Sequence, residues 1–147
     1  MKNPQELFYN LAYNLALVAY KHDEVPVGAV IIKDDTYELV SSGYNQMRSN
    51  KSSLDHAEML ALRSAMSRLN QERLIGCSMI TTLEPCPMCA QAISYARLSS
   101  VSFSAEDVKS GGILHGPRIF DSSSCHHKPD VIRYDDDGKS RELLQKF

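Results

Sequence analysis

Apolar side chains recur at helical spacing near the start of the chain. The recurring positions are Leu7, Leu11, Leu15 and Val18, and Phe8 and Ala12 widen the stripe. They predict an amphipathic helix that ends near Lys21 and lies on a sheet. Asn3 as the N-cap, Pro4 at the first helical position and Glu6 in the first turn predict where this helix begins. The stripe belongs to the core and carries no chemistry.

Runs rich in β-branched residues predict five strands in the rest of the chain. They cover residues 25–33, 38–44, 78–82, 101–104 and 131–134. Further helical patterns cover residues 55–69, 85–98 and 141–147. In the last helix we expect Leu143, Leu144 and Phe147 to face inwards. This order of elements predicts an α/β fold, in which ligands usually bind at the carboxyl edge of the sheet.

Length and composition favour one intracellular domain. The 147 residues contain no signal-peptide pattern and no apolar run near the ~20 residues that cross a membrane, so we expect a cytoplasmic protein. The four cysteines should then stay reduced, with Cys77 and Cys125 as incidental thiols. A formal charge of −2 and a pI near 6.2 count against a general nucleic-acid coat.

A local basic patch remains compatible with this acidic balance. The basic residues in segments that could rim a pocket are Arg48, Lys51, Lys109, Arg118, Lys128 and Arg133. Each of them fits an ordinary solvated surface position equally well.

Three side chains from two separate segments form a ligand set for zinc. His56 supplies a nitrogen, and Cys86 and Cys89 supply two thiolates from one face of a predicted helix. A helix N-terminus favours the thiolate form of both cysteines. Three protein ligands leave one coordination position for water, whose pKa zinc lowers to about 7. An open position is typical of a catalytic zinc site.

Glu58 follows His56 by two residues, and we predict that it carries protons rather than binding the metal. In a different interpretation, Asp55 is the N-cap and Glu58 completes a capping box. The downstream thiols of Cys86 and Cys89 favour the catalytic interpretation, because the ligands and the acid occur together. A purely structural zinc site would need a fourth ligand from Cys77, Cys125, His126 or His127.

The combination of H-x-E with P-C-x-x-C is the signature of zinc-dependent nucleobase deaminases. Around it, the chain reads EVPVGAVI at 24–31, GYN at 43–45, DHAEMLAL at 55–62 and TLEPCPMC at 82–89. These runs resemble the bacterial tRNA-specific adenosine deaminases of the cytidine/deoxycytidylate deaminase superfamily, and residues 110–129 resemble the distal part of some members. The resemblance implies one zinc-dependent deaminase domain over residues 1–147. It also implies a three-layer α/β/α fold with a central five-stranded mixed sheet.

The same resemblance implies hydrolytic deamination of adenosine to inosine, at the wobble position of a tRNA anticodon. One Zn²⁺ per subunit would be held by His56, Cys86 and Cys89. An activated water would attack C6 of the base, and Glu58 would carry its proton to the ring and to the leaving amine. The implied partners are the tRNA anticodon loop and a second copy of the chain, without a membrane.

The resemblance further places six residues beside the substrate, namely Val27, Asn45, Ala57, Glu84, Asp107 and Lys109. The amide of Asn45 would offer a donor and an acceptor to the base, although Asn after a strand more often shapes a turn. Asp107 would accept a bond from a ribose 2′-hydroxyl, and in a different interpretation it caps a helix. We expect the backbone N–H of Glu84 to be free to polarise the attacking water.

Two other functions remain open at this point. The first is a deaminase of free guanine, cytosine or cytidine, because the zinc ligands alone do not choose among these substrates. The second is a non-catalytic zinc module that binds RNA, against which Glu58 argues. The chain also has no Trp, and Tyr44 stands where many members of the family carry one.

Overall fold

The structure is a computed structural model that describes residues 4–147, so the predicted cap at Asn3 lies outside the described residues. The elements are, in order, α1 (Pro4–Lys21), β1 (Gly28–Lys33), β2 (Leu39–Tyr44), α2 (Ala57–Leu69), β3 (Cys77–Leu83), α3 (Pro87–Tyr95), β4 (Ser100–Ala105), the 3₁₀ turn η1 (Ile119–Asp121), β5 (Asp130–Arg133) and α4 (Lys139–Lys146). Among residues 4–147, no helix combines the length and the apolar character that a bilayer span requires.

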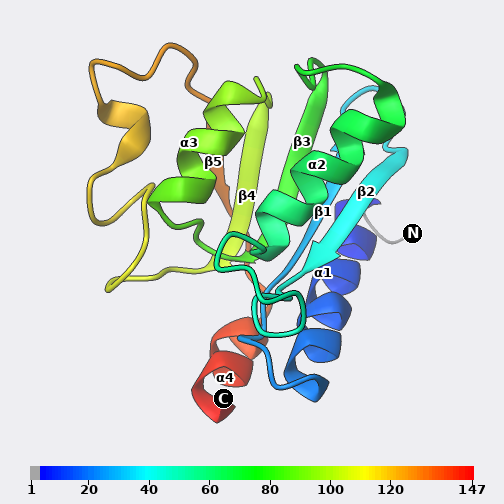
Figure 1. The fold of residues 1–147 in the computed structure, drawn as a ribbon, viewed down its shortest axis with the longest axis vertical. Coiled ribbons are helices and arrows are strands. Elements are labelled where there is room, and N and C mark those ends of the chain that lie inside the picture. Colours follow the sequence, from blue (N-terminus) through cyan, green and yellow to red (C-terminus); the bar gives the residue numbers. More distant parts are fainter. Residues whose placement is uncertain (1–3) are drawn as a thin grey trace.

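The strands form one mixed sheet in the order β2-β1-β3-β4-β5 (Figure 1). β1 is antiparallel to both β2 and β3, whereas β3, β4 and β5 run parallel. The amino end of β1 therefore lies at the same edge as the carboxyl ends of β2, β3 and β4. Gly28 pairs with Tyr44 at this edge, and Leu83 pairs with Ala105. The predicted five-stranded mixed sheet is confirmed.

Helices cover both faces of the sheet, which confirms the predicted three-layer α/β/α architecture (Figure 1). α2 and α3 lie on one face, and α1 and α4 lie on the other. Ile31, Met79 and Phe103 belong to the larger core under α2 and α3, while Val30 and Ile80 belong to the smaller core under α1. Neighbouring residues of β1 and β3 thus alternate between the two cores, as the pleat of a strand requires.

Gly28 opens β1 where α1 crosses the sheet. A Cβ at this position would lie 2.1 Å from the carbonyl oxygen of Ala12 and 2.8 Å from the amide nitrogen of Ala16. Glycine is therefore required here by close helix packing. β1 is shorter than predicted because the chain makes a tight turn before it, in which the amide of Val27 donates to the carbonyl of Val25.

The start of α2 differs from the sequence prediction. Its N-cap is His56, whose own side chain forms no capping hydrogen bond. The carboxylate of Asp55 instead accepts a hydrogen bond from Nδ2 of Asn50 at 2.9 Å. Both Asp55 as the N-cap and Glu58 as half of a capping box are therefore wrong, because contacts from the preceding loop draw Asp55 away from the helix.

Two further helix ends were mispredicted. α3 begins at Pro87, with Cys86 as its N-cap, and Pro85 precedes the helix. Phe147 was expected to face inwards, but it is 50% exposed, with the guanidinium of Arg48 lying over its ring at 5.6 Å from the centroid. A cation over an aromatic face is a stable arrangement at the surface, so this ring does not need the core. Leu143 is buried as predicted.

Candidate active site

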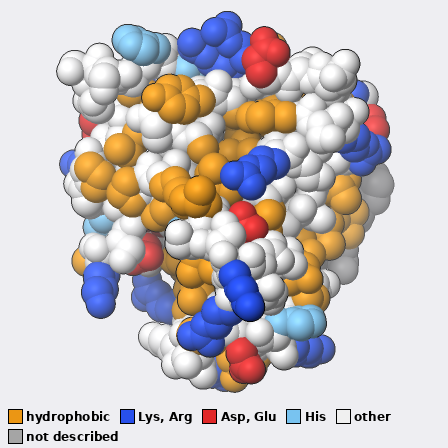
Figure 2. All heavy atoms as spheres, in the orientation of Figure 1, with side chains coloured by type: hydrophobic (Ala, Val, Ile, Leu, Met, Phe, Trp, Pro, Cys, Tyr) orange, Lys and Arg blue, Asp and Glu red, His pale blue; other side chains and the backbone are white. Residues whose placement is uncertain are grey.

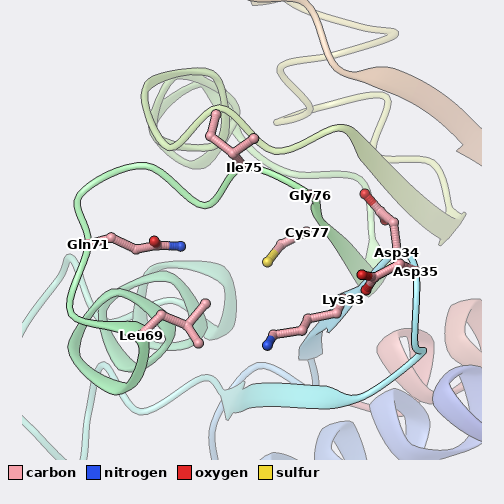
Figure 3. A pocket seen from close by; sticks show the side chains of 8 residues that line it. All are labelled: Lys33, Asp34, Asp35, Leu69, Gln71, Ile75, Gly76 and Cys77. Atoms are coloured by element: carbon pink, nitrogen blue, oxygen red, sulfur yellow. The ribbon is translucent and has the colours of Figure 1, made fainter.

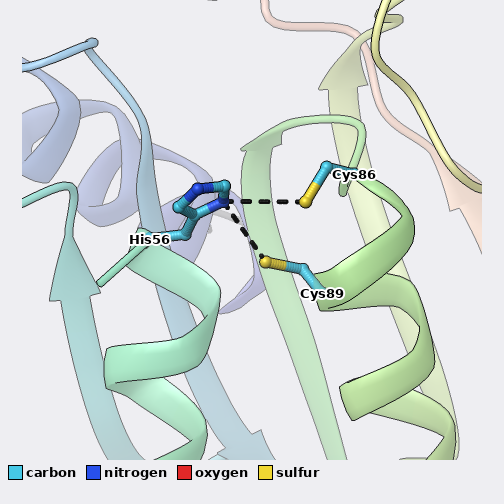
Figure 4. A group of neighbouring side chains, drawn as sticks. All are labelled: His56, Cys86 and Cys89. Carbon is cyan, nitrogen blue, oxygen red and sulfur yellow. Dashed lines mark hydrogen bonds between the residues drawn. The ribbon is translucent and has the colours of Figure 1, made fainter. Parts of the chain in front are cut away.

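Two helix starts bring three candidate metal ligands together (Figure 4). His56 precedes α2, Cys86 precedes α3, and Cys89 lies in the first turn of α3. Their ligand atoms all lie within 4.8 Å of one another, and Nδ1 of His56 lies 3.6 Å from each sulfur. A tetrahedral zinc ion with Zn–S and Zn–N bonds of about 2.3 and 2.05 Å separates sulfur from nitrogen by about 3.6 Å. The three side chains therefore fit zinc.

No fourth protein ligand joins this group within the described part of the chain. The sulfur of Cys125 donates to the carbonyl of His127, and Nε2 of His127 donates to the carbonyl of Leu98 at 2.6 Å. Cys77 lies at the opposite edge of the sheet, at the start of β3. The structural-zinc interpretation lacks its ligand, and the open position expected of a catalytic site remains.

The two ligand sulfurs and the imidazole lie within hydrogen-bonding distance of one another. The hydrogen bond from Cys89 lowers the pKa of Cys86 to about 4, and the same bond together with burial raises the pKa of Cys89. The bond to Cys86 also raises the pKa of His56. One sulfur is thus a thiolate at neutral pH, which prepares the group for a cation.

Glu58 lies in the first turn of α2, next to this group. Its side chain is 5% exposed and lines the cavity described below. Burial raises the pKa of Glu58 to about 7, the nearby Cys86 adds to the increase, and the carboxylate's bond to its own backbone N–H opposes it. A divalent cation on His56 and the cysteines acts in the opposite direction, because positive charge favours the carboxylate. A carboxyl group held near neutrality can both accept and release a proton.

A cavity of about 170 Å³ opens beside Glu58 and the metal ligands. It is lined by Val25, Val27, Asn45, Met47, His56, Glu58, Leu83, Glu84, Cys86, Asp107 and Ser110. Of the predicted substrate contacts, Val27, Asn45, Glu84 and Asp107 therefore reach the cavity. Lys109 is exposed on the neighbouring turn, and Ala57 is fully buried behind the wall. Val25, Met47 and Leu83 had not been assigned to the site, and as single residues in loops or at strand ends they carry no distinctive signal.

Asn45 links the second strand to the start of α2. Its Oδ1 accepts the backbone N–H of Ala57 at 2.7 Å, and its own backbone N–H donates to the carbonyl of Val27 at 3.2 Å. Ala57 is the first residue of α2, so Asn45 satisfies a helix N–H that has no partner inside the helix. The side-chain oxygen is thereby engaged by the protein, and Nδ2 is the group that Asn45 can offer to a ligand.

Glu84 does not have the free backbone N–H that we expected, because this group donates to the carbonyl of Ala105 at 2.8 Å. The side chain instead holds the loop after β4. Its carboxylate accepts the backbone N–H groups of Asp107, Ile113, Leu114 and His115 at 2.9–3.2 Å, and Nδ1 of His115 at 2.8 Å. The sequence gives no local sign of this role, since all the partners lie more than twenty residues away.

The surroundings of Glu84 favour its charged form. Burial alone would raise the pKa of this carboxyl, but the bonds from His115 and from the loop amides hold it below its ordinary value. The loop also approaches it closely, since a Cβ on Gly111 would lie 2.3 Å from its Oε2. Glu84 thus fixes residues 107–115 as one wall of the cavity.

Asp107 does not cap a helix, because residues 108–110 form only a turn. Its Oδ1 accepts the backbone N–H of Ser110 at 2.8 Å and so caps this turn. Its side chain also lines the cavity. The turn cap therefore leaves Asp107 at the position where a ribose contact was expected.

A larger hollow than the cavity beside Glu58 lies elsewhere (Figure 3). It has a volume of about 430 Å³ and lies at the opposite edge of the sheet, between the end of β1 at Lys33 and the start of β3 at Cys77. Burial raises the pKa of the Cys77 thiol, which disfavours the thiolate that metal binding needs. No group of three ligands forms there among the described residues, so size alone does not identify the active site.

Comparisons with known proteins agree with this geometry. Residues 2–105 match the family described as the cytidine and deoxycytidylate deaminase zinc-binding region. A tRNA-specific adenosine deaminase of Agrobacterium fabrum is 40% identical over 140 residues, which cover 95% of this chain and 91% of the relative. A solved structure from a study of A-to-I editing by tRNA:A34 deaminases at the wobble position is 39% identical, with a TM-score of 0.90 over 94% of this chain and 99% of that chain.

A guanine deaminase from Nitrosomonas europaea has the same fold at 20% identity, with a TM-score of 0.80 over 95% of this chain and 81% of that chain. This likeness shows the fold alone. The family match accounts for the spacing of His56, Cys86 and Cys89, because it is a zinc-binding family. The family match covers residues 2–105, and the similarity to the tRNA-specific adenosine deaminase of Agrobacterium fabrum extends over 95% of the chain. The chain therefore belongs to the zinc-binding cytidine and deoxycytidylate deaminase family, and within it to the tRNA-specific adenosine deaminases.

Proposed function

We propose that this protein hydrolyses adenosine to inosine at the wobble position of a tRNA anticodon. The observation that carries the proposal is the zinc-spaced group of His56, Cys86 and Cys89 with Glu58 beside it in one cavity. The likeness to tRNA-specific adenosine deaminases supports adenosine in tRNA over free guanine, cytosine or cytidine.

Glu58 would be the catalytic proton carrier. Bound zinc supplies an activated water, since it lowers the pKa of that water to about 7. Glu58 would accept one proton of this water and deliver it to N1 of the purine. It would then take the second proton from the oxygen added at C6 and deliver it to the amine, so that the C6–N bond breaks and water and adenosine become inosine and ammonia. Its position supports this role, because Glu58 lies in the first turn of α2, next to His56, and lines the same cavity as the metal ligands His56 and Cys86.

The remaining cavity residues would bind the nucleotide. Apolar side chains such as Met47 and Leu83 offer flat walls to a base that has been turned out of the anticodon loop. Nδ2 of Asn45 donates to a purine nitrogen while Ala57 holds its Oδ1 in place. The oxygen of Asp107 that does not cap the turn accepts a hydrogen bond from the ribose 2′-hydroxyl.

We further infer that residues 1–147 form a single deaminase domain and that it works as a homodimer in the cytoplasm. Hydrophobic side chains gather over α3 and the loop beside it, where Met88 and Ala92 are only partly buried (Figure 2). Such a patch favours burial between two copies. Light scattering should then give about twice the chain mass of 16.4 kDa, and a mass of one chain would exclude the dimer.

The substrate is tested by measuring inosine in an anticodon stem-loop that carries adenosine at the wobble position, with free adenosine, guanine and cytidine in parallel. Conversion confined to the stem-loop, and absent in zinc-loaded Glu58→Ala, supports both the substrate and the role of Glu58. Conversion of a free base or nucleoside alone would keep the zinc chemistry and overturn the RNA substrate.

A further inference from the structure

A second polar hollow lies at the carboxyl end of α3, far from the catalytic cavity. It has a volume of about 140 Å³ and is lined by Arg73, Gln91, Ser94, Tyr95, Arg97, Ser124, His126 and His127. No carboxylate lines it. Among residues 4–147, neither Arg73 nor Arg97 forms an ion pair, whereas Arg63, Arg118 and Arg133 each pair with a carboxylate. The hollow therefore concentrates positive charge in a chain whose formal charge is −2.

Arg97 occupies a backbone position that normally suits glycine. α3 ends at Tyr95 with Ala96 as its C-cap, and Arg97 follows with φ of +62°. Residues that end a helix in this left-handed conformation are usually Gly, because a Cβ is strained there. An arginine at such a site makes the fold less stable than a glycine would, so the backbone conformation does not explain why position 97 carries a guanidinium group. The side chain extends over the hollow, where Nη1 donates to the carbonyl of His126 at 3.4 Å.

Tyr95 adds an aromatic surface to this basic hollow. It is the last residue of α3 and is 73% exposed, although a tyrosine usually buries its ring when it can. Exposed aromatic rings interleaved with arginine are typical of surfaces that bind single-stranded or looped RNA, in which bases stack on the rings and cations hold the phosphates. The combination favours a nucleic acid over a small free anion.

The distance from the catalytic cavity suits an RNA strand. α3 begins next to the metal ligand Cys86 and ends at Tyr95, and its nine residues span about 13 Å at ~1.5 Å per residue. In Figure 1 the end of α3 lies at the top of the view, next to the loop that leads into β5, whereas α2 and α3 both begin near the lower edge of the sheet. The hollow therefore lies within the reach of an RNA loop whose base is turned into the cavity.

We propose that Arg73, Arg97 and His126 form a phosphate-binding subsite for the backbone of the RNA substrate, with Tyr95 stacking on a base. The subsite holds the anticodon stem-loop while the adenosine is turned into the cavity. This inference rests on the proposed function, because it takes RNA as the substrate. It adds a second point of attachment that none of the catalytic residues supplies.

The test uses zinc-loaded full-length Arg73→Ala and Arg97→Gly, with Arg68→Ala as a control that removes the same charge at a distant site, where Arg68 pairs with Glu38. On the stem-loop we expect KM to rise about tenfold in each subsite variant with kcat unchanged, as for the loss of a charge-assisted hydrogen bond. The slope of log K against log salt should fall by about one. On a trinucleotide centred on the same adenosine, the variants should match the wild type.

Arg97→Gly separates binding from folding, because it should raise the thermal unfolding midpoint while it weakens RNA binding. An unchanged KM and an unchanged salt slope in Arg73→Ala and Arg97→Gly would overturn the subsite. If either variant became a monomer while the wild type is a dimer, the hollow would be part of a subunit interface, and this result would also overturn the subsite. Fluorescence anisotropy with the same RNA distinguishes the two proposals. If the wild type binds the RNA more tightly than Arg97→Gly does but does not deaminate it, the proposed function alone is overturned. If the wild type and Arg97→Gly bind and deaminate the RNA equally well, the subsite alone is overturned.

Discussion

Two buried glutamates line the same cavity, and the protein treats them in opposite ways. Glu58 is 5% exposed, and burial raises its pKa to about 7. Glu84 is 1% exposed, yet its pKa is lowered, because four backbone N–H groups and the ring of His115 donate to it. The number of donors around a buried carboxyl group, and not its burial, decides whether it stays charged.

This difference separates a chemical role from an architectural one. A carboxylate with several donors is held as an anion and organises the groups that donate to it, as Glu84 does for the loop 107–115. A carboxyl group with few donors remains able to exchange its proton, as the proposed role of Glu58 requires. Substitutions of the two residues should therefore fail in different ways.

The largest effect is expected for Glu58→Gln. The amide keeps the shape of the side chain but cannot carry a proton, so kcat should fall by about 10³-fold or more. The free energy of unfolding should stay the same or rise, because a poorly solvated carboxyl group has been removed. Single-turnover inosine formation and denaturant unfolding check the two halves of this prediction. Full activity in the variant would remove Glu58 from the mechanism.

Glu84→Gln should show the reverse pattern. An amide has one acceptor oxygen, and its NH₂ group would point toward backbone N–H groups, which cannot accept its hydrogen bonds. Several of these backbone N–H groups would therefore lose their acceptor, so the free energy of unfolding should fall by about 3 kcal/mol. We expect zinc to remain bound, since Glu84 is not a ligand, and KM to rise as the wall 107–115 loosens. Urea unfolding and metal analysis measure these effects.

Glu106→Gln is the matched control for this change. Glu106 lies on the same loop, but its side chain is 34% exposed and pairs with Arg133 at the surface. Exposed ion pairs contribute ~1 kcal/mol or less, so this variant should stay within about that amount of the wild type. Equal losses in Glu84→Gln and Glu106→Gln would show that the loop does not depend on Glu84.

Much of this arrangement could be predicted from the sequence, because its signals are local. The apolar pattern of α1 and the β-branched runs of the sheet follow the periods of a helix and a strand, and these elements were confirmed. The predicted core stripe of α1 was only partly right. Leu7 is 56% exposed, and the buried residues of this helix are Ala12, Ala16 and Ala19, because α1 packs too closely on the sheet for larger side chains. His56, Cys86 and Cys89 were predicted from their spacing and from the H-x-E and P-C-x-x-C signature, since ligands at helix starts leave a short motif, and the structure brings their ligand atoms within 4.8 Å of one another.

What the sequence did not reveal depends on distant partners. Asp55 looked like a helix cap because three residues separate it from Glu58, but Asn50 binds it from the preceding loop. Glu84 looked like a neighbour of the cysteine turn, although its partners lie on the loop that ends at His115. In both cases tertiary hydrogen bonds overrode a local pattern, and no periodicity in the sequence records such bonds.

Asn45 is an intermediate case between the two glutamates, because one end of its amide serves the fold and the other is left for substrate. In Asn45→Asp, an oxygen can still accept the N–H of Ala57, so stability should change little. The donor Nδ2 is lost, and kcat/KM on the stem-loop should fall about tenfold. Asn45→Ala should lose both, with a lower free energy of unfolding as well. Equal stability of these two variants would show that the bond to Ala57 contributes nothing.

A third buried glutamate, Glu24, tests the same rule with a smaller expected effect than Glu84. The carboxylate of Glu24 is 1% exposed and accepts the backbone N–H groups of Arg48 and Ser49 at 3.0 and 2.7 Å, and the Ser49 hydroxyl at 2.7 Å. Burial alone would raise its pKa, but these bonds hold it below the ordinary value of 4.5. Glu24 pins the loop that carries Met47 to the cavity, so it should behave as Glu84 does and not as Glu58 does.

Because the pKa of Glu24 is lower in the folded state, the unfolded chain binds the proton first as the pH falls. The contribution of Glu24 to stability is therefore complete above the unfolded pKa of about 4.5 and is lost as the pH falls through the folded pKa. Glu24→Gln lacks this contribution, so wild type should exceed it by about 1–2 kcal/mol at pH 7. Urea unfolding from pH 7 to pH 3 should show that the difference in free energy of unfolding between wild type and Glu24→Gln shrinks below pH 4.5. Both proteins release zinc in acid, and this shared effect cancels in the difference. A difference that stays constant, or widens in acid, would mean that donors around a buried carboxyl group do not set its charge here.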